Sequence, residues 1–277
     1  MRIFTGSNGD LGKVFENNYK INTDKFYSKK ELDITKYEDV KKIVKMNKNI
    51  NSFINFAAYT NVFKSENEKK KSLEVNAVAL ENLCEILNEF KVKLYHISTD
   101  YVFNNKNKEN YEKDFTNPIN YYGYTKMMGE NIILKKSKNY SIIRTSLLFS
   151  KYENNYVRKI QKIIMKNEKL LITNDIGCPT SCLNFSNFIN EVSKRNYKTK
   201  EILHYRDYPN VSRLTFTKKI IKIIEKKYKK KYKNRISIIN NYDEIKRPRR
   251  SILNCNLTFE KYRIDKKKWI KDLNNII

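Results

Sequence analysis

The chain of 277 residues is poor in cysteine and acidic residues, and it has few glycines. Its 4 cysteines include Cys178 and Cys182, which lack the second pair or the nearby histidine that a zinc site needs. No apolar run is long enough to span a membrane, and polar residues from Ser7 onward argue against a secretory leader. We therefore expect a cytoplasmic protein with free thiols.

Acidic residues are outnumbered by basic ones, 30 to 57, which gives a formal net charge of +27. Such an excess is typical of nucleic-acid-binding proteins. Here, however, lysines are spread along the chain together with Asn, Ile and Tyr, as AT-rich codon usage produces. The densest run, from Lys226 to Lys233, follows a helical pattern and suits a solvated helix end. We expect neither a nucleic-acid nor a membrane partner, only a general attraction for anionic ligands.

Glycine is concentrated in one place, because 3 of the 6 glycines stand in the stretch TGSNGDLG at residues 5–12. This stretch follows a short apolar strand and precedes a helical pattern. Glycine lets a backbone turn tightly and approach a pyrophosphate, while the next helix offers free N–H groups. The spacing is G-x-x-G-x-x-G instead of the standard G-x-G-x-x-G. It predicts a phosphate cradle, with an ordinary strand–turn–helix junction as the alternative.

Strand and helix patterns alternate from the first residue, which is typical of an α/β protein with a Rossmann-type doubly wound parallel sheet. Strands are predicted at 1–4, 25–27, 52–55, 92–98 and 141–149. Helices are predicted at 10–18, at 35–44 behind a capping box of Thr35 and Glu38, and at 72–90, 120–134, 155–165, 183–192 and 214–225. We predict a dinucleotide-binding domain at 1–150, to which parts of 175–200 return, and a smaller substrate-binding lobe at 151–277.

Tyr122 and Lys126 stand four apart at the start of a predicted helix, so their side chains share one face. Tyrosine has a reference pKa of about 10, and a neighbouring ammonium group lowers it. Tyr122 is therefore a candidate general acid that would protonate a carbonyl being reduced. In a chain with 20 tyrosines, the simpler interpretation is that the two residues only mark an exposed helix turn. Thr99 follows a strand, at the sheet edge where ligands bind. His96, inside that strand, is interpreted as a core residue.

Together these motifs resemble the dTDP-4-dehydrorhamnose reductases, a family of the extended short-chain dehydrogenase/reductases. The resemblance runs nearly end to end. It is carried by the glycine loop and by ELDIT at 31–35, AAYT at 57–60, STDYVF at 98–103, residues 117–130, RTS at 144–146, NYV at 155–157, GCPT at 177–180 and RP at 247–248.

The resemblance implies reduction of the C4 ketone of a nucleotide-activated 6-deoxy sugar by NADPH, with dTDP-4-dehydrorhamnose as the expected substrate, for surface polysaccharide synthesis. Tyr122 would protonate the sugar oxygen, Lys126 would hold the nicotinamide ribose and tune Tyr122, and Thr99 would bond the carbonyl. The residues implied in cofactor binding are Gly6, Asn8, Gly9, Asp10, Leu11, Asp33, Ile34, Ala57, Ala58 and Tyr59. Those implied in facing the sugar nucleotide are Thr60, Val62, Asp100, Tyr101 and Asn155. No metal ligand is assigned.

Several positions depart from the family pattern. Relatives usually carry an acidic residue after the second strand, where this chain has Ser28 followed by Lys29 and Lys30. An acid there repels a 2′-phosphate, whereas a hydroxyl beside ammonium groups accepts it. We therefore predict a preference for NADPH over NADH, with a surface lysine pair that touches no ligand as the alternative. Leu147 and Phe63 replace a tryptophan and an acid expected near the sugar, which leaves the exact sugar open.

Two other functions stay open on the sequence alone. One is a related sugar-nucleotide reductase, epimerase or dehydratase, and the other is a non-catalytic NADP-binding regulatory subunit. The intact set of Thr99, Tyr122 and Lys126 argues against the regulatory subunit, which has no need of it. The nucleotide base and the oligomeric state are not fixed by the sequence, which is compatible with a homodimer.

Overall fold

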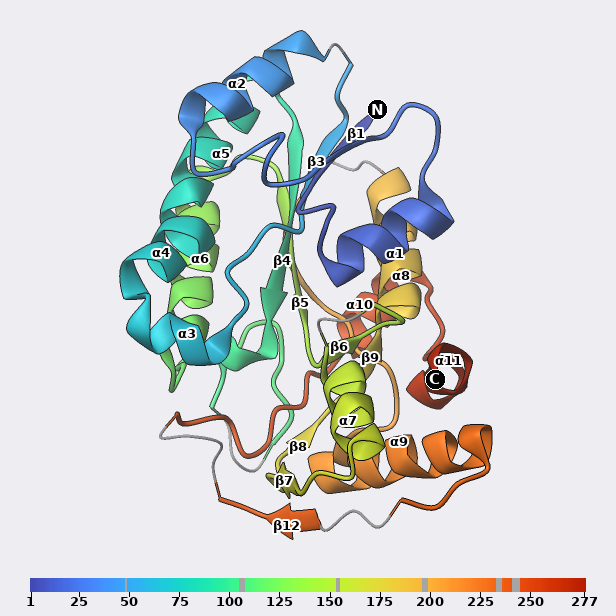
Figure 1. Cartoon of the computed structure of the whole chain (residues 1–277). Coiled ribbons are helices and arrows are strands. Elements are labelled where there is room, and N and C mark those ends of the chain that lie inside the picture. Colours follow the sequence, from blue (N-terminus) through green and yellow to red (C-terminus); the bar gives the residue numbers. More distant parts are fainter. Residues whose placement is uncertain (48, 105–107, 153–154, 196–198, 233–235, 241–244) are drawn as a thin grey trace.

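A six-stranded parallel sheet forms the centre of the computed structural model, which describes residues 1–47, 49–104, 108–152, 155–195, 199–232, 236–240 and 245–277 (Figure 1). The strands follow the order β10-β5-β4-β3-β1-β2. Their bounds are Arg2–Thr5 for β1, Lys25–Tyr27 for β2, Ser52–Asn55 for β3, Lys93–Thr99 for β4, Tyr140–Thr145 for β5 and Lys200–His204 for β10. The predicted Rossmann-type sheet is confirmed.

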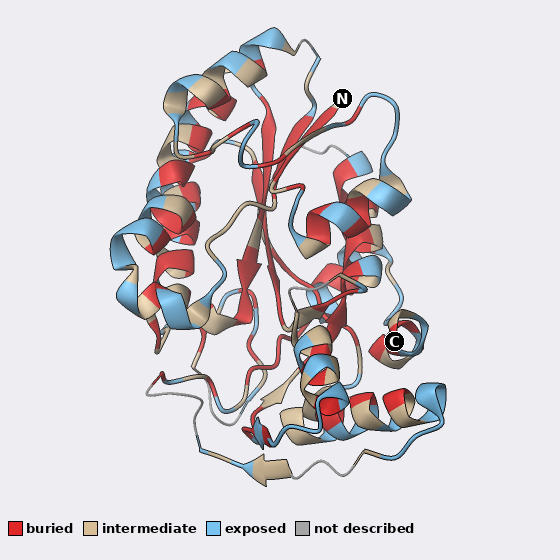
Figure 2. Ribbon diagram, in the orientation of Figure 1, coloured by how far each residue is buried: buried red, intermediate tan, exposed pale blue. Residues whose placement is uncertain are grey.

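Both faces of this sheet are buried, because successive side chains of a strand point to opposite sides. Ile3, Phe53 and Leu94 pack in one core with the helices α2 (Tyr37–Met46), α5 (Ala79–Glu89) and α6 (Tyr121–Lys136). Their chain neighbours Phe4, Ile54 and Tyr95 pack in another core with α1 (Asp10–Tyr19), α8 (Cys182–Lys194) and α10 (Asn256–Tyr262). Figure 2 shows the central strands β1, β3, β4 and β5 buried along nearly their whole length, and the flanking helices with both buried and exposed residues.

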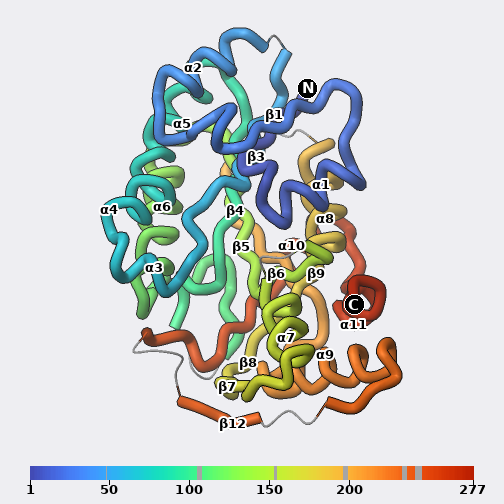
Figure 3. Tube along the Cα trace, viewed as in Figure 1, coloured from blue at the N-terminus to red at the C-terminus, as the bar shows by residue number. Residues whose placement is uncertain are grey.

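The second half of the chain contributes to the sheet as well as to a smaller lobe. Figure 3 shows α8 beside α1, although these two helices are far apart in the sequence, and β10 is the edge strand next to β5. The lobe has its own core, built from α7 (Tyr156–Met165), α9 (Arg213–Tyr228), α11 (Trp269–Ile276), β7 (Leu170–Ile172) and β12 (Ile236–Ile238). Short strands lie between: β6 (Leu148–Phe149) pairs with β9 (Thr180–Ser181), and β8 (Ile176–Gly177) with β11 (Val211–Ser212).

Three local predictions are wrong in detail. The capping box is absent, because α2 begins at Tyr37 and the Thr35 hydroxyl donates instead to Asp33. The strand predicted at 141–149 is two strands, since Leu147 adopts a positive φ of 39° that breaks the ladder. The helix predicted at 72–90 is interrupted by a π-helical turn η1 (Glu74–Val78) between α4 (Lys69–Leu73) and α5.

The basic run near residue 230 is a solvated helix end, as expected. Lysines 226, 227, 229 and 230 are exposed around the end of α9, and Lys233 lies outside the described residues. In the part of the chain that the structure describes, no helix has both the length and the apolar character needed to cross a membrane.

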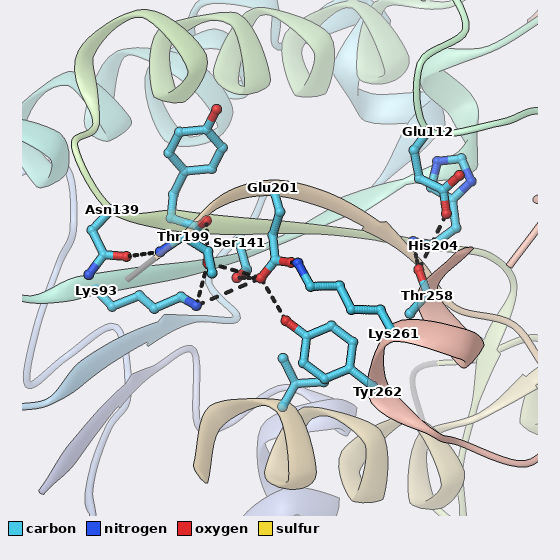
Figure 4. Close-up of polar contacts among 12 residues, drawn as sticks. Lys93, Glu112, Asn139, Ser141, Thr199, Glu201, His204, Thr258, Lys261 and Tyr262 are labelled. Atoms are coloured by element: carbon cyan, nitrogen blue, oxygen red, sulfur yellow. Dashed lines mark hydrogen bonds and ion pairs between the residues drawn. The ribbon is translucent and has the colours of Figure 1, made fainter. Parts of the chain in front are cut away.

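A buried cluster of polar side chains ties the edge strand β10 to its neighbours (Figure 4). The Glu201 carboxylate accepts hydrogen bonds from the hydroxyls of Ser141 (2.6 Å) and Tyr262 (2.8 Å) and from the Lys261 ammonium (2.5 Å). The Lys93 nitrogen lies 3.7 Å from the same carboxylate. Burial lowers the pKa of Lys93 to about 8, although Glu201 opposes that shift. The cluster joins β4, β5, β10 and α10.

Candidate active site

A cavity of about 1120 Å³ lies at the carboxyl ends of the sheet strands, with walls from both the sheet and the lobe. All but one of the predicted site residues line it. The lining residues that were predicted are Gly6, Asn8, Gly9, Asp10, Leu11, Lys29, Asp33, Ile34, Ala57, Ala58, Tyr59, Thr60, Val62, Thr99, Asp100, Tyr101, Tyr122, Lys126 and Asn155. The exception is Ser28.

The glycine loop is shaped so that other residues would not fit. Gly6 has a φ of +71°, and a β-carbon built on it would lie 2.6 Å from the Ala57 nitrogen. A β-carbon on Gly12 would lie 2.7 Å from the Gly6 carbonyl oxygen. The loop therefore turns directly into α1, whose first N–H groups and positive dipole end suit a diphosphate. These features fit a dinucleotide cofactor.

The segment after β2 forms another part of the cavity wall. Lys29 lines the cavity, with its nitrogen 3.6 Å from the Asp33 carboxylate. Ser28 is buried, and its backbone N–H donates to the Glu31 carboxylate at 2.7 Å. Lys29 thus lies on the cavity wall, whereas Ser28 does not, and the predicted contact of either residue with a cofactor stays a prediction.

The end of β3 is held from two sides. The Asn55 carboxamide oxygen accepts the Ala57 N–H at 3.1 Å, which fixes the turn into Ala57 and Ala58. Asn76, on the π-helical turn η1, accepts the Tyr59 N–H at 2.8 Å and donates to the Tyr59 carbonyl at 3.0 Å. The small Ala57 and Ala58 leave room for a flat ring against the sheet edge, and π-helical turns are frequent at such sites.

Tyr122 is placed by the first turn of α6. Asn120 caps this helix by accepting the Gly123 N–H at 2.8 Å, and a β-carbon on Gly123 would lie 2.3 Å from the Tyr101 carbonyl oxygen. Burial raises the pKa of Tyr122 above its ordinary value, against the opposing effect of its hydrogen bond with Thr99. The lowering expected from Lys126 is therefore not found, because burial dominates. At neutral pH Tyr122 is a protonated phenol, the form that can donate a proton.

Lys126 lies one turn further along α6 and is almost fully buried. Its nitrogen is 2.7 Å from the Ile97 carbonyl oxygen and 3.0 Å from His96 Nε2. Burial lowers the pKa of Lys126 to about 8, and the Glu130 carboxylate opposes this shift. His96 is a buried residue, as predicted, but its contact with the candidate catalytic lysine was not foreseen.

Thr99 ends β4 and begins the short 3₁₀ helix η2 (Asp100–Val102). Its hydroxyl accepts the Tyr101 N–H and donates to Asp100 Oδ1 at 3.1 Å. Burial raises the pKa of Asp100 to about 6, so this carboxyl group takes up its proton at a higher pH than an exposed one. Thr99 and Tyr122 thus present two hydroxyl groups to the same end of the cavity.

Asn155 links the lobe to the glycine loop. It caps α7, and its amide nitrogen donates to the Asp10 carboxylate at 2.7 Å. Ser150 donates to the same carboxylate oxygen at 2.8 Å. Asn155 thus lies beside the start of α1 as well as on the cavity wall, and its predicted contact with the sugar nucleotide stays a prediction.

Several further residues of the lobe line the cavity and were not assigned to the site from sequence. They include Asp175, Cys178, Arg213 and Ser251. The Arg213 guanidinium lies 4.9 Å from the centre of the Tyr156 ring. Burial raises the pKa of both Asp100 and Tyr101, and the charge of Arg213 opposes this rise. Arg213 follows a two-residue strand and belongs to no motif, so only its place at the start of a helix could have drawn attention to it.

Known proteins are similar to this chain in sequence and in fold. The model of the RmlD substrate binding domain matches residues 1–277. A dTDP-4-dehydrorhamnose reductase of Aggregatibacter actinomycetemcomitans is 29% identical over 99% of this chain and 97% of its own length. The crystal structure of a dTDP-4-dehydrorhamnose reductase from Bacillus anthracis, in complex with NADP, has a TM-score of 0.88 at 28% identity, over 99% of this chain and 97% of the other. This chain belongs to the RmlD substrate binding domain family.

Proposed function

We propose that the protein reduces the C4 ketone of a nucleotide-activated 4-keto-6-deoxy sugar, with dTDP-4-dehydrorhamnose as the expected substrate and NADPH as the cofactor. One observation supports this most strongly: Thr99, Tyr122 and Lys126 line the same cavity as the glycine loop. The reaction belongs in the cytoplasm, where NADPH is available, and its product would enter surface polysaccharide synthesis.

NADPH would supply the hydride, held at its diphosphate by the glycine loop and the first turn of α1. Thr99 would turn its hydroxyl from Asp100 to the sugar carbonyl oxygen, orienting the ketone. Tyr122 would give its phenolic proton to that oxygen as negative charge develops there. An alkoxide is a stronger base than a phenolate, so this transfer is favourable even though burial raises the pKa of Tyr122.

Lys126 would serve the cofactor as an ammonium group near the nicotinamide ribose, and there it would stabilise the tyrosinate left after proton transfer. Lys29 would accept the adenosine 2′-phosphate, which favours NADPH. The walls contributed by the lobe would bind the sugar nucleotide. A homodimer stays a prediction, which light scattering after size-exclusion chromatography tests.

The test is NADPH oxidation with dTDP-4-dehydrorhamnose, compared between the wild type and Tyr122→Phe. General-acid catalysis contributes about 10²–10⁴-fold in rate, so the variant should lose that much in kcat while its Kd for NADPH stays unchanged. Tight NADPH binding without turnover of any 4-keto sugar nucleotide would support a regulatory subunit instead. Turnover of another sugar nucleotide only would support a different enzyme of the same superfamily.

A further inference from the structure

A chain of three side chains, Asn55, His96 and Lys126, runs from β3 through β4 to α6, and its first member has only one orientation. The Asn55 oxygen faces the backbone N–H of Ala57 at 3.1 Å, and a backbone N–H can only donate. The Thr5 hydroxyl meets the same oxygen at 2.7 Å. The Asn55 NH₂ group must therefore face His96 Nδ1, which lies 3.1 Å away.

This orientation fixes the proton on the His96 ring. Because the Asn55 NH₂ group donates to Nδ1, that nitrogen carries no proton, and the neutral ring carries its proton on Nε2. The ring is 1% exposed, and burial holds the pKa of His96 well below its ordinary value. His96 therefore presents an N–H donor on its Nε2 side.

That donor points at Lys126, whose nitrogen lies 3.0 Å from His96 Nε2. An ammonium group has three donors and no acceptor, so it cannot receive this hydrogen bond, whereas a neutral amine can accept it through its lone pair. The same amine donates to the Ile97 carbonyl oxygen at 2.7 Å. The contact geometry is thus that of a neutral lysine.

The other ionisable neighbours on α6 do little to restore the charge. The Glu130 carboxylate favours the ammonium form, but it is itself bound by the buried Arg144 guanidinium at 2.6 Å. Tyr122, one turn earlier, is a neutral phenol near pH 7 because burial raises its pKa. Burial of Lys126 favours its neutral amine form, as the hydrogen bond from His96 does.

We propose that His96, oriented by Asn55, is a positioning residue that favours the neutral amine form of Lys126 against β4, and that NADPH binding makes the neutral fraction of Lys126 take up a proton. The inference rests on the proposed function, in which the cofactor ribose calls for an ammonium group. On binding, the hydrogen bond from His96 Nε2 to Lys126 breaks. A proton from solvent forms a new N–H bond on Lys126, and His96 keeps its own proton.

Calorimetric titration of the enzyme with NADPH, in buffers of equal pH and different ionisation enthalpy, measures this uptake directly. With a free-state pKa of about 8 for Lys126, uptake should rise from about a tenth of a proton at pH 7 to about nine-tenths at pH 9. The 2′-phosphate titrates near pH 6, so it can release at most about a tenth of a proton at pH 7 and almost none above pH 8, where the uptake by Lys126 is large. Lys126→Met should bind NADPH with no uptake.

Two variants test the role of His96. His96→Phe removes the donor, so the rise in uptake should move to higher pH. Asn55→Asp is isosteric, but its second carboxylate oxygen would accept a proton from Nδ1, which leaves Nε2 as an acceptor for an ammonium group. Uptake near pH 8.5 should therefore fall in both variants. Far-UV circular dichroism checks that each is folded.

The outcomes separate the two proposals. Failure to bind NADPH would overturn the proposed function and this inference with it. Binding with no proton exchange between pH 7 and 9 in the wild type overturns the inference alone. So does an unchanged uptake profile in a folded His96→Phe variant, because Lys126 would then be neutral through burial only.

Discussion

Gly6 lies so close to Ala57 that a β-carbon on Gly6 would be 2.6 Å from the Ala57 backbone nitrogen. This contact joins the glycine loop to the end of β3, whose Asn55 side chain also holds the Ala57 N–H. Position 6 therefore requires glycine for two independent reasons: its φ is +71°, and the Ala57 backbone beside it leaves no space for a side chain. The shape of the phosphate cradle depends on both.

Replacing Gly6 should consequently damage both stability and cofactor binding. Gly6→Ala places a side chain at positive φ and against rigid backbone, which costs about 1–3 kcal/mol of unfolding free energy. The Kd for NADPH should rise at least about tenfold, since the loop must shift. Gly177→Ala is the matched control, because a β-carbon there meets nothing within 4 Å. Thermal unfolding and fluorescence titration measure both effects, and equal losses in the two variants would contradict the explanation.

The cofactor preference should depend on the segment after β2. Ser28 does not line the cavity, but Ser28→Asp puts a carboxylate next to Lys29, where it would compete with the 2′-phosphate for the Lys29 ammonium. The ratio of kcat/KM for NADPH over NADH should therefore fall about three- to tenfold. Lys29→Ala removes a cation from the cavity wall and should lower the same ratio by about three- to tenfold. Lys30→Ala, at an exposed position outside the cavity lining, serves as the control. A ratio unchanged in both test variants would mean that the adenosine lies elsewhere.

Most of the sheet follows from local patterns in the sequence, because consecutive apolar residues such as Ile3 and Phe4 point to opposite faces and so indicate a strand buried on both of them. The glycine loop can likewise be predicted from the sequence, since few residues other than glycine tolerate its backbone geometry. The π-helical turn at Glu74–Val78 is different: it serves contacts of Asn76 with Tyr59 and α6 that lie far away in sequence. The failed capping box at Thr35 has a local cause instead, because Asp33, two residues earlier, accepts the hydrogen bond from the Thr35 hydroxyl.

The site shows the same division between local and distant information. The spacing of Tyr122 and Lys126 is visible in the sequence, yet the state of Lys126 depends on His96 and Ile97, which belong to another strand. Arg213 reaches the cavity only because the lobe folds back over the sheet edge. Burial, which raises the pKa of Tyr122 instead of lowering it, is likewise a property of the assembled fold.

Asp100 should make stability depend on pH. Burial raises its pKa to about 6 from an ordinary value of 3.8, so the folded state binds a proton more tightly than the unfolded state. The stabilisation from this proton is complete below about pH 4 and is lost as the pH rises through 6. Asp100→Asn lacks the ionisation and can still accept the Thr99 hydrogen bond.

Relative to the wild type, Asp100→Asn should therefore gain about 2 kcal/mol in unfolding free energy between pH 4 and pH 7. Urea unfolding at several pH values measures the difference, and using the difference removes the contribution of other titrating groups. Parallel pH profiles for the two proteins would show that Asp100 does not carry a raised pKa.

In the buried cluster around Glu201, the contact between Glu201 and Lys93 should contribute more to stability than the contact between Glu201 and Lys261. Glu201→Ala leaves the Lys93 nitrogen without its carboxylate at a position that is 2% exposed, and breaking a buried pair in this way costs about 3–5 kcal/mol. Lys261→Ala removes an ammonium that is 51% exposed and touches the same carboxylate, so it should cost at most about 1 kcal/mol. Urea unfolding of the two variants compares them directly. If Lys261→Ala were as destabilising as Glu201→Ala, the stabilisation would come from the link between β10 and α10 and not from shielding a buried charge.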